Sequence, residues 1–207
     1  MYLSISGQTV TQKTIEKSRF ITTSRHVESE EEAKDFISEI SAKYRDATHN
    51  CYAYVCDETG NFLRFSDDGE PQGTAGMPML EVLKTKKLFQ IAAVVTRYFG
   101  GIKLGAGGLV RAYSGSVSEN LDTAQKVLYQ MCSESKYTVG YSGAETAARF
   151  FSEFGAEVKS VEYLNEVHFV IAVKKENEYD FNSELLNRLN GKVEVLKLKE
   201  YYYPFKI

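Results

Sequence analysis

Residues 96–113 read TRYFGGIKLGAGGLVRAY, and they follow the apolar run IAAVV at residues 91–95. An apolar run of this length, ending at a loop, predicts a strand over residues 89–98 that is buried on both faces. Five glycines fall within the nine residues 100–108, so a tight loop follows this strand. The spacing of small and apolar residues after the loop predicts a helix from near Gly107 to beyond Leu121.

The segments before this loop have the periodicity of further strands and one helix. Four short strands are predicted, at residues 10–15, 20–26, 51–56 and 62–65. Between the second and third of them, Ser29 followed by Glu32 forms a capping box that opens a helix. The first half of the chain is therefore a mixed α and β module.

The last third has a regular order of elements. Strands are predicted near residues 137–141, 158–163, 167–173 and 193–198, and helices near residues 142–155 and 181–189. Ser142 and Glu145 form the capping box of the first of these helices, and Gly155 ends it. The resulting order β-α-β-β-α-β is the signature of a ferredoxin-like module. We predict an α+β fold with two domains, residues 1–132 and residues 135–207.

The composition restricts the class of protein. The 207 residues include 25 Lys and Arg and 28 Asp and Glu, a net charge of −3, which excludes a globally basic nucleic-acid binder. Residues 61–113 nevertheless contain seven basic and four acidic residues, so this segment carries +3. No apolar run approaches the roughly 20 residues that cross a bilayer. The 3 cysteines are too few for a disulfide framework, so we expect a cytoplasmic protein without a membrane anchor.

The glycine-rich segment has three basic residues in or beside it, Arg97, Lys103 and Arg111. Backbone N–H groups in such a loop and at a helix start favour a bound anion, and basic side chains would strengthen that preference. The segment lacks both the Lys-Ser or Lys-Thr ending of a Walker motif and the spacing of a dinucleotide fingerprint. The alternative interpretation is structural, because glycine also allows tight packing of a strand against a helix.

Residues 66–78 place three carboxylates, Asp67, Asp68 and Glu70, within four positions of a loop rich in Gly and Pro. Carboxylates this close repel one another unless a cation or a hydrogen-bond donor lies among them. One interpretation is a site for a hard cation or an acid–base pair. The other is a capped turn, in which Asp67 and Asp68 accept from nearby backbone N–H groups and Gly69 supplies a positive φ.

His49 and Cys51 lie two positions apart, so they share one face of a predicted strand. A cysteine and a histidine with a nearby carboxylate are one arrangement of a nucleophilic site. The simpler interpretation is a hydrogen-bonded histidine beside a small buried thiol.

Four blocks of the sequence resemble the IMPACT family, in particular its bacterial, YigZ-type members with two domains. These blocks are KSRFI at residues 17–21, HNCYAY at residues 49–54, SDDGEPQGTAG at residues 66–76 and VVTRYFGGIKLGAGGLVRAY at residues 94–113. The resemblance implies a first domain with the fold of ribosomal protein S5 domain 2 and a second, ferredoxin-like domain. The last third of the chain matches the bacterial members in length and element order.

The resemblance also implies a role in translation. Eukaryotic members of the family regulate translation by binding a ribosome-associated activator of a stress kinase, and association with RNA or the ribosome is the usual suggestion for bacterial members. We therefore expect a non-enzymatic regulator that binds RNA or the ribosome, with a protein partner in translation control as a related expectation. The resemblance implies no catalytic residue, metal or cofactor. The candidate binding residues are Asp67, Asp68, Glu70, Arg97, Gly100, Gly101, Lys103, Gly105, Gly107, Gly108 and Arg111.

Two other functions are compatible with these residues. The first is an enzyme acting on a small molecule or nucleotide, in which residues 105–108 would hold phosphates and the acidic residues would bind a metal or act as base. The second is a protein-interaction module that uses the tyrosine-rich and sheet surfaces. The sequence implies no particular oligomeric state.

Overall fold

The structure is a computed structural model that describes residues 1–206. The chain divides into two compact units, Tyr2–Leu128 and Tyr129–Phe205. Each unit combines an antiparallel sheet with helices, so the α+β class is confirmed. The assignments to an S5-like and a ferredoxin-like fold, and the domain limits 1–132 and 135–207, stay predictions. Within residues 1–206, no helix is long and apolar enough to cross a membrane.

The first unit is built on a five-stranded sheet in the order β2-β3-β6-β4-β5. Its strands are β2 (Gln8–Ile15), β3 (Ser18–His26), β6 (Ile91–Tyr98), β4 (His49–Val55) and β5 (Leu63–Ser66). All neighbouring strands pair antiparallel. The five strands predicted for this half of the sequence are therefore confirmed.

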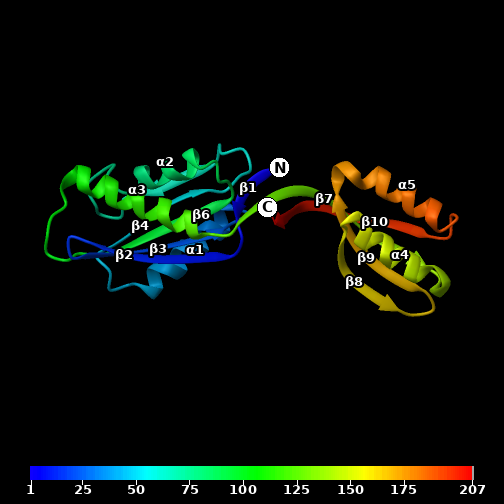
Figure 1. Cartoon of the computed structure of the whole chain (residues 1–207). Helices are drawn as coiled ribbons and strands as arrows, with labels where there is room; N and C mark the ends of the chain where they lie inside the picture. The colour runs from blue at the N-terminus through cyan, green and yellow to red at the C-terminus, as the bar shows by residue number, and fades with distance from the viewer. Residues whose placement is uncertain (207) are drawn as a thin grey trace. The chain divides into compact units, whose positions relative to one another are not determined.

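Helices cover both faces of this sheet (Figure 1). Helix α1 (Glu30–Lys43) lies on one face, and α2 (Gly76–Thr85) and α3 (Gly105–Thr123) lie on the other. The central strand β6 serves both layers, because Ala92 and Val94 pack in the core with α1, whereas Ala93 and Val95 pack in the core with α2 and α3. This explains why β6 is apolar on both faces.

Capping at the start of α1 follows the sequence. The Ser29 side chain accepts a hydrogen bond from the Glu32 backbone N–H, and this satisfies one of the free donors of the first turn. The N-cap predicted at Ser29 is confirmed.

Two elements of the first unit are not predicted from the sequence. Strand β1 (Tyr2–Ile5) has four residues, and the Ser6 N–H that follows it donates to the carbonyl of Gln125. Helix α2 begins inside the segment that the sequence analysis treats as a Gly- and Pro-rich loop. Pro78 is its third residue, where a backbone N–H has no partner within the helix, so the ring does not interrupt it.

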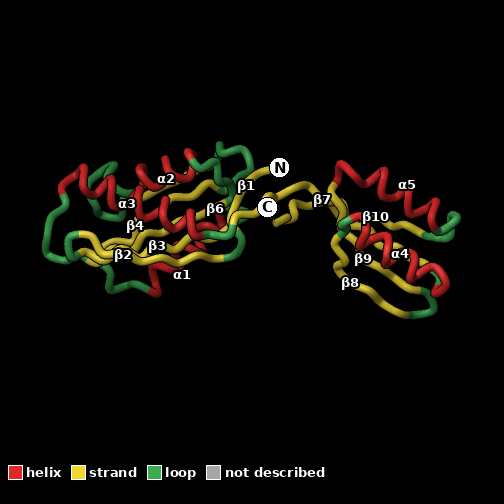
Figure 2. The backbone as a smooth tube through the Cα atoms, in the orientation of Figure 1, coloured by secondary structure: helices red, strands yellow, loops and turns green. Residues whose placement is uncertain are grey.

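The second unit has the element order that the sequence predicts (Figure 2). The elements are β7 (Lys126–Val139), α4 (Tyr141–Phe154), β8 (Glu157–Tyr163), β9 (Val167–Lys174), the short 3₁₀ helix η1 (Lys175–Asn177), α5 (Glu178–Arg188) and β10 (Glu194–Lys206). Strand β9 lies between β7 and β8, and β10 also pairs with β7. The core between sheet and helices is aromatic, with Tyr137, Phe151 and Phe181 in contact.

Two local expectations for this unit are wrong in detail. Strand β7 begins at Lys126 rather than near Tyr137, so one continuous strand runs through the predicted boundary between the domains. Helix α4 begins at Tyr141 with Gly140 as N-cap and no side-chain cap, so Ser142 already lies inside the helix. Gly155 does end the helix, with a φ of 74° in the left-handed region.

The turn between β2 and β3 packs directly against the glycine-rich loop. A Cβ atom added to Gly100 would lie 2.0 Å from both the carbonyl carbon and the carbonyl oxygen of Lys17 and 2.5 Å from the nitrogen of Ser18. The Gly100 N–H donates to the Ser18 hydroxyl at 3.2 Å. Because only backbone atoms are involved, no side-chain rotation relieves such a clash, and only glycine fits at position 100.

We predict that Gly100→Ala lowers the free energy of unfolding by at least about 3 kcal/mol, because the added methyl group meets rigid backbone. Gly107→Ala is the matched control. A Cβ at Gly107 meets nothing within 4 Å, and the change should stabilise the helix by roughly 0.5–1 kcal/mol. Urea unfolding of the full chain measures both. Equal stability of the two variants would show that the close approach at Gly100 is not a constraint.

Candidate functional site

A cleft of about 440 Å³ opens where the loop after β5, the start of β4 and the loop between β6 and α3 meet. Its lining residues are Thr48, His49, Gly69, Glu70, Pro71, Arg97, Phe99, Lys103, Leu104, Gly105, Ala106 and Leu109. The acidic segment and the glycine-rich loop, which are about thirty residues apart in sequence, therefore adjoin in the fold.

Asp67 organises the acidic loop. Its carboxylate accepts hydrogen bonds from the backbone N–H groups of Gly73 at 2.8 Å, Ala75 at 3.0 Å and Gly76 at 2.8 Å. The last two donors belong to the start of α2, where a negative charge also complements the helix dipole. Asp67 is thus the side-chain cap of α2, supplied from eight residues before the N-cap position.

Asp68 fastens the same loop to β4. Its Oδ2 atom accepts from the Asn50 N–H at 2.5 Å, and its backbone carbonyl lies 2.7 Å from Nδ1 of His49. Asp68 and Gly69 both have positive φ, at 43° and 82°. The capped-turn interpretation therefore describes this loop. In the described chain, no three His, Cys, Asp or Glu side chains group so that they could hold a metal ion.

Glu70 forms a buried ion pair at the base of the cleft. Its side chain is 3% exposed, and its Oε1 atom accepts from Arg97 Nη1 at 2.6 Å and from the Tyr113 hydroxyl at 2.7 Å. The Arg97 side chain is 5% exposed, and its Nη2 donates to the Ser18 hydroxyl at 3.3 Å. The pair joins the acidic loop, β6 and α3.

Burial corrects the expectation for Arg97. The sequence analysis places Arg97 with Lys103 and Arg111 as a phosphate contact, but its guanidinium is enclosed and already paired with Glu70. A charge this buried needs a fixed partner, and Glu70 supplies it. Arg97 therefore supports the cleft from below and does not belong to an exposed basic surface.

His49 presents a hydrogen-bond acceptor to the cleft. A carbonyl oxygen only accepts hydrogen bonds, so Nδ1 of His49 must donate to the carbonyl of Asp68. In the neutral ring, Nε2 is then an acceptor, and it lies 3.9 Å from Oε2 of Glu70. This distance is too long for a hydrogen bond, so two acceptors face each other across a gap.

Cys51 lies beneath the cleft, where its thiol is enclosed. Its Sγ lies 2.9 Å from the Asp67 carbonyl oxygen, to which the single S–H donates, and 3.4 Å from the Tyr113 hydroxyl oxygen. The residue is fully buried, and burial raises the pKa of its thiol far above the ordinary value. His49 is engaged by Asp68 and faces Glu70, so the structure supports the simpler interpretation of this pair.

The glycine-rich loop ends in an uncapped helix start. Gly101 and Gly105 have φ values of 88° and 68°, which glycine adopts without strain. Helix α3 begins at Gly105, two residues before the predicted start, and it has neither a side-chain cap nor an acidic residue in its first turn. Backbone N–H groups at such a helix end favour an anion.

The remaining basic candidates lie beside this helix start. Lys103 is exposed and lines the cleft. Together with Arg111 and Gly108 it also lines an adjoining hollow of about 450 Å³, in which Glu16 is the one carboxylate. In the described part of the chain, neither Lys103 nor Arg111 forms an ion pair.

The structure thus separates the predicted residues by role. Glu70, Arg97, Lys103 and Gly105 line the cleft, and Gly108 and Arg111 line the adjoining hollow. Asp67, Asp68 and Gly100 hold the loops, and Gly101 and Gly107 line neither. Sequence reasoning missed Tyr113, Phe99 and Ser18. The available signal was that all three lie within two of the quoted blocks, residues 17–21 and 94–113.

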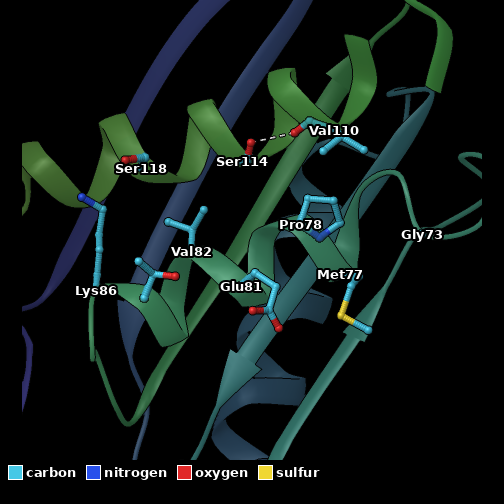
Figure 3. Close-up of a pocket in the computed structure, with 10 residues that line it drawn as sticks. Gly73, Met77, Pro78, Glu81, Val82, Lys86, Val110, Ser114 and Ser118 are labelled. Carbon is cyan, nitrogen blue, oxygen red and sulfur yellow. Dashed lines mark hydrogen bonds between the residues drawn. The ribbon is translucent and has the colours of Figure 1, made fainter. Parts of the chain in front are cut away.

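A second groove lies between α2 and α3 (Figure 3). Its volume is about 560 Å³, and Met77, Pro78, Val82 and Val110 give it an apolar lining. Figure 3 shows Ser114 on its α3 side, where the hydroxyl donates to the carbonyl of Val110 instead of facing a ligand. None of the candidate binding residues lines this groove.

The segments that build the cleft match a known domain. Residues 16–121 match the family model described as the Impact N-terminal domain, and residues 138–192 match a domain of unknown function, DUF1949. The chain belongs to the IMPACT family. Every residue that lines the cleft falls within the first match, so the cleft is a feature of the Impact N-terminal domain of this chain.

Relatives match this IMPACT family chain along nearly its whole length. IMPACT family member YvyE of Bacillus subtilis is 42% identical over 181 residues, which cover 87% of this chain and 83% of that protein. IMPACT family member YigZ of Escherichia coli is 35% identical over 190 residues, which cover 90% and 92%. A solved structure described as a hypothetical protein has a TM-score of 0.60 at 32% identity, covering 96% of this chain and 97% of that one.

The three thiols provide a test of the buried site. Burial raises the pKa of Cys51 and Cys56, and it raises that of Cys132 to about 11. A raised pKa keeps a thiol protonated at pH 8, and all three residues are buried. We predict that Ellman's reagent modifies none of them rapidly at pH 8 in the native protein, and modifies all three after denaturation. Rapid modification of Cys51 in the native protein would contradict this prediction and would support the interpretation of Cys51 and His49 as a nucleophilic pair.

Proposed function

We propose that this IMPACT family protein is a non-enzymatic, translation-associated regulator that binds RNA or the ribosome through its first unit. The observation that carries the proposal is the pair of exposed, unpaired basic side chains Lys103 and Arg111 beside the uncapped start of α3. Cations in this arrangement contact phosphates, while the N–H groups of the helix start donate hydrogen bonds to the phosphate oxygens. A cytoplasmic location belongs to the same proposal.

The surroundings of α3 favour an anionic partner. Lys17 and Arg19 are exposed in and after the β2–β3 turn, whose backbone packs against Gly100. Glu16 is the acidic residue of this turn, so basic side chains outnumber it. The local surface is therefore positive although the whole chain carries −3, as electrostatic attraction of a polyanion requires.

The alternatives have less support in the geometry. An enzyme that uses Asp67 as a metal ligand or base would have to break the three hydrogen bonds that cap α2. A protein-interaction module could use the apolar groove between α2 and α3, but nothing at that groove specifies an occupant. Binding of a protein partner in translation control is compatible with the proposed role.

Charge reversal tests the proposed surface. We predict that Lys103→Glu with Arg111→Glu weakens binding to RNA or ribosomes roughly tenfold or more. The slope of the logarithm of the binding constant against the logarithm of the salt concentration should become smaller in magnitude by about 2. Lys34→Glu with Lys43→Glu is the matched control, because these exposed residues lie on α1, across the sheet, and the net charge changes equally. Co-sedimentation with ribosomal particles at several salt concentrations measures both.

Equal loss of binding in the two double variants would mean that only net charge matters. No retention of the unaltered protein on ribosomes or RNA at low salt would contradict the proposal itself. Retention that is lost only in the α3 variant would locate the contact at Lys103 and Arg111.

A further inference from the structure

The cleft contains one carboxylate oxygen that the protein leaves without a donor. Oε1 of Glu70 accepts two hydrogen bonds, whereas Oε2 accepts none from the described chain. The side chain as a whole is 3% exposed. Among the described residues, Nε of Arg97 is the enclosed side-chain N or O atom without a partner, so Oε2 of Glu70 is open to the cleft, where a ligand that donates a hydrogen bond can reach it.

A second acceptor faces this oxygen. Nε2 of His49 lies 3.9 Å from Oε2 of Glu70, and in the neutral ring with a proton on Nδ1 it carries a lone pair. The hydrogen bond from Nδ1 to the Asp68 carbonyl fixes the ring in this orientation. Two fixed acceptors at this spacing complement a ligand with two adjacent O–H donors, which is the chemistry of a cis-diol.

The other side of the cleft suits an anion. Lys103, Gly105 and Ala106 line it, so the ligand meets an ammonium group and the uncapped amides of α3. Because Arg97 neutralises Glu70, Lys103 leaves the lining with one net positive charge when His49 is neutral. A ligand with both a diol and a phosphate matches the two sides.

An aromatic ring completes the lining. Phe99 lines the cleft and is 47% exposed, and the Arg97 guanidinium lies 5.5 Å from its ring centre. An exposed aromatic ring of this kind stacks on a nucleobase of any sequence. The volume of about 440 Å³ falls within the usual range for small-ligand sites, roughly 300–1,000 Å³.

We infer that this cleft binds a ribonucleotide with a free 2′,3′-diol: Glu70 and His49 accept from the diol, Lys103 and the start of α3 bind the phosphate, and Phe99 stacks on the base. A free mononucleotide and the 3′ end of an RNA strand share this chemistry. The inference rests on the proposed function for its RNA source. It adds that the protein recognises a terminus rather than the interior of a strand.

Ligand analogues test the diol directly with the unaltered protein. Adenosine 5′-monophosphate should bind in isothermal titration, and its 2′-deoxy and 3′-deoxy analogues should each bind roughly tenfold more weakly, because each lacks one of the two O–H donors. Equal affinity for the three nucleotides, or no binding of any of them and of RNA at millimolar concentration, would overturn the inference.

A pair of aromatic variants locates the site. Phe99→Ala should weaken nucleotide binding about tenfold, because a stacking partner is lost. Phe62→Ala is the control, since Phe62 is similarly exposed at 45% and does not line the cleft. Circular dichroism confirms that both variants fold. Equal effects of the two substitutions would place binding elsewhere and overturn the inference.

Short RNA strands show whether the ligand of the cleft is an RNA 3′ end or a free mononucleotide. They also distinguish failure of the cleft inference from failure of the proposed RNA or ribosome binding. Oligouridylate with a free 3′ end should bind more tightly than the same strand with a 3′-phosphate. If both strands bind equally and Phe99→Ala changes neither, terminus recognition is overturned while RNA binding through Lys103 and Arg111 stands. If mononucleotides bind with dependence on the diol but neither RNA nor ribosomes are retained, the cleft inference stands for free nucleotides and the proposed function fails.

Discussion

The buried ion pair between Glu70 and Arg97 joins the elements that surround the cleft of the first unit. Glu70 comes from the loop after β5, Arg97 from the end of β6, and the Tyr113 hydroxyl that completes the carboxylate's shell comes from α3. Removing two charges from water costs several kcal/mol per ion, and only close pairing with further hydrogen bonds compensates for it. The geometry supplies the close pairing, with a 2.6 Å contact and both side chains at least 95% enclosed, while Nε of Arg97 is left without a hydrogen-bond partner in the described chain.

The pair also determines what the cleft can recognise. It uses one oxygen of Glu70 and leaves the other beside His49, so the site presents fixed acceptors instead of a free negative charge. Both carboxylate oxygens of Asp67 and Oδ2 of Asp68 accept hydrogen bonds from backbone N–H groups. Lys103 remains as the unneutralised cation of the lining, and the first turn of α3 lies next to it. An acidic segment and a basic loop therefore form one pocket that suits an anion.

Local pattern was sufficient for most of the fold. Residue periodicity and, for β6, a continuous apolar run predicted the strands of the first sheet, and the order of elements in the last third follows from periodicities that the structure reproduces. Helix α2 was missed because the side chain that caps it, Asp67, lies far before the helix in sequence instead of at the N-cap position. In addition, its first turn contains Pro78, which is typical of a loop. Strand β7 was underestimated because its first half alternates less clearly than residues 137–139.

The site was predictable in its parts but not in its roles. The blocks rich in glycine and aspartate are the segments that adjoin at the cleft, and the Impact N-terminal domain and DUF1949 matches fall in the first and second units. The sequence could not show that Arg97 points inward, because a strand that is buried on both faces gives no alternation to indicate direction. Nor could it show that Glu70 and Arg97 meet, since a contact across 27 positions depends on the whole sheet order.

A double-mutant cycle on Glu70 and Arg97 tests the central claim most directly. Hydrogen exchange of the β6 amides reports unfolding of the first unit alone in Glu70→Gln, Arg97→Met and the double variant. Each single change should cost about 3–5 kcal/mol, because it leaves an uncompensated buried partner. The double change should cost less than the sum, with a coupling of at least about 2 kcal/mol. Costs that add to within about 0.5 kcal/mol would show that the two residues do not act as a pair, and would contradict the account.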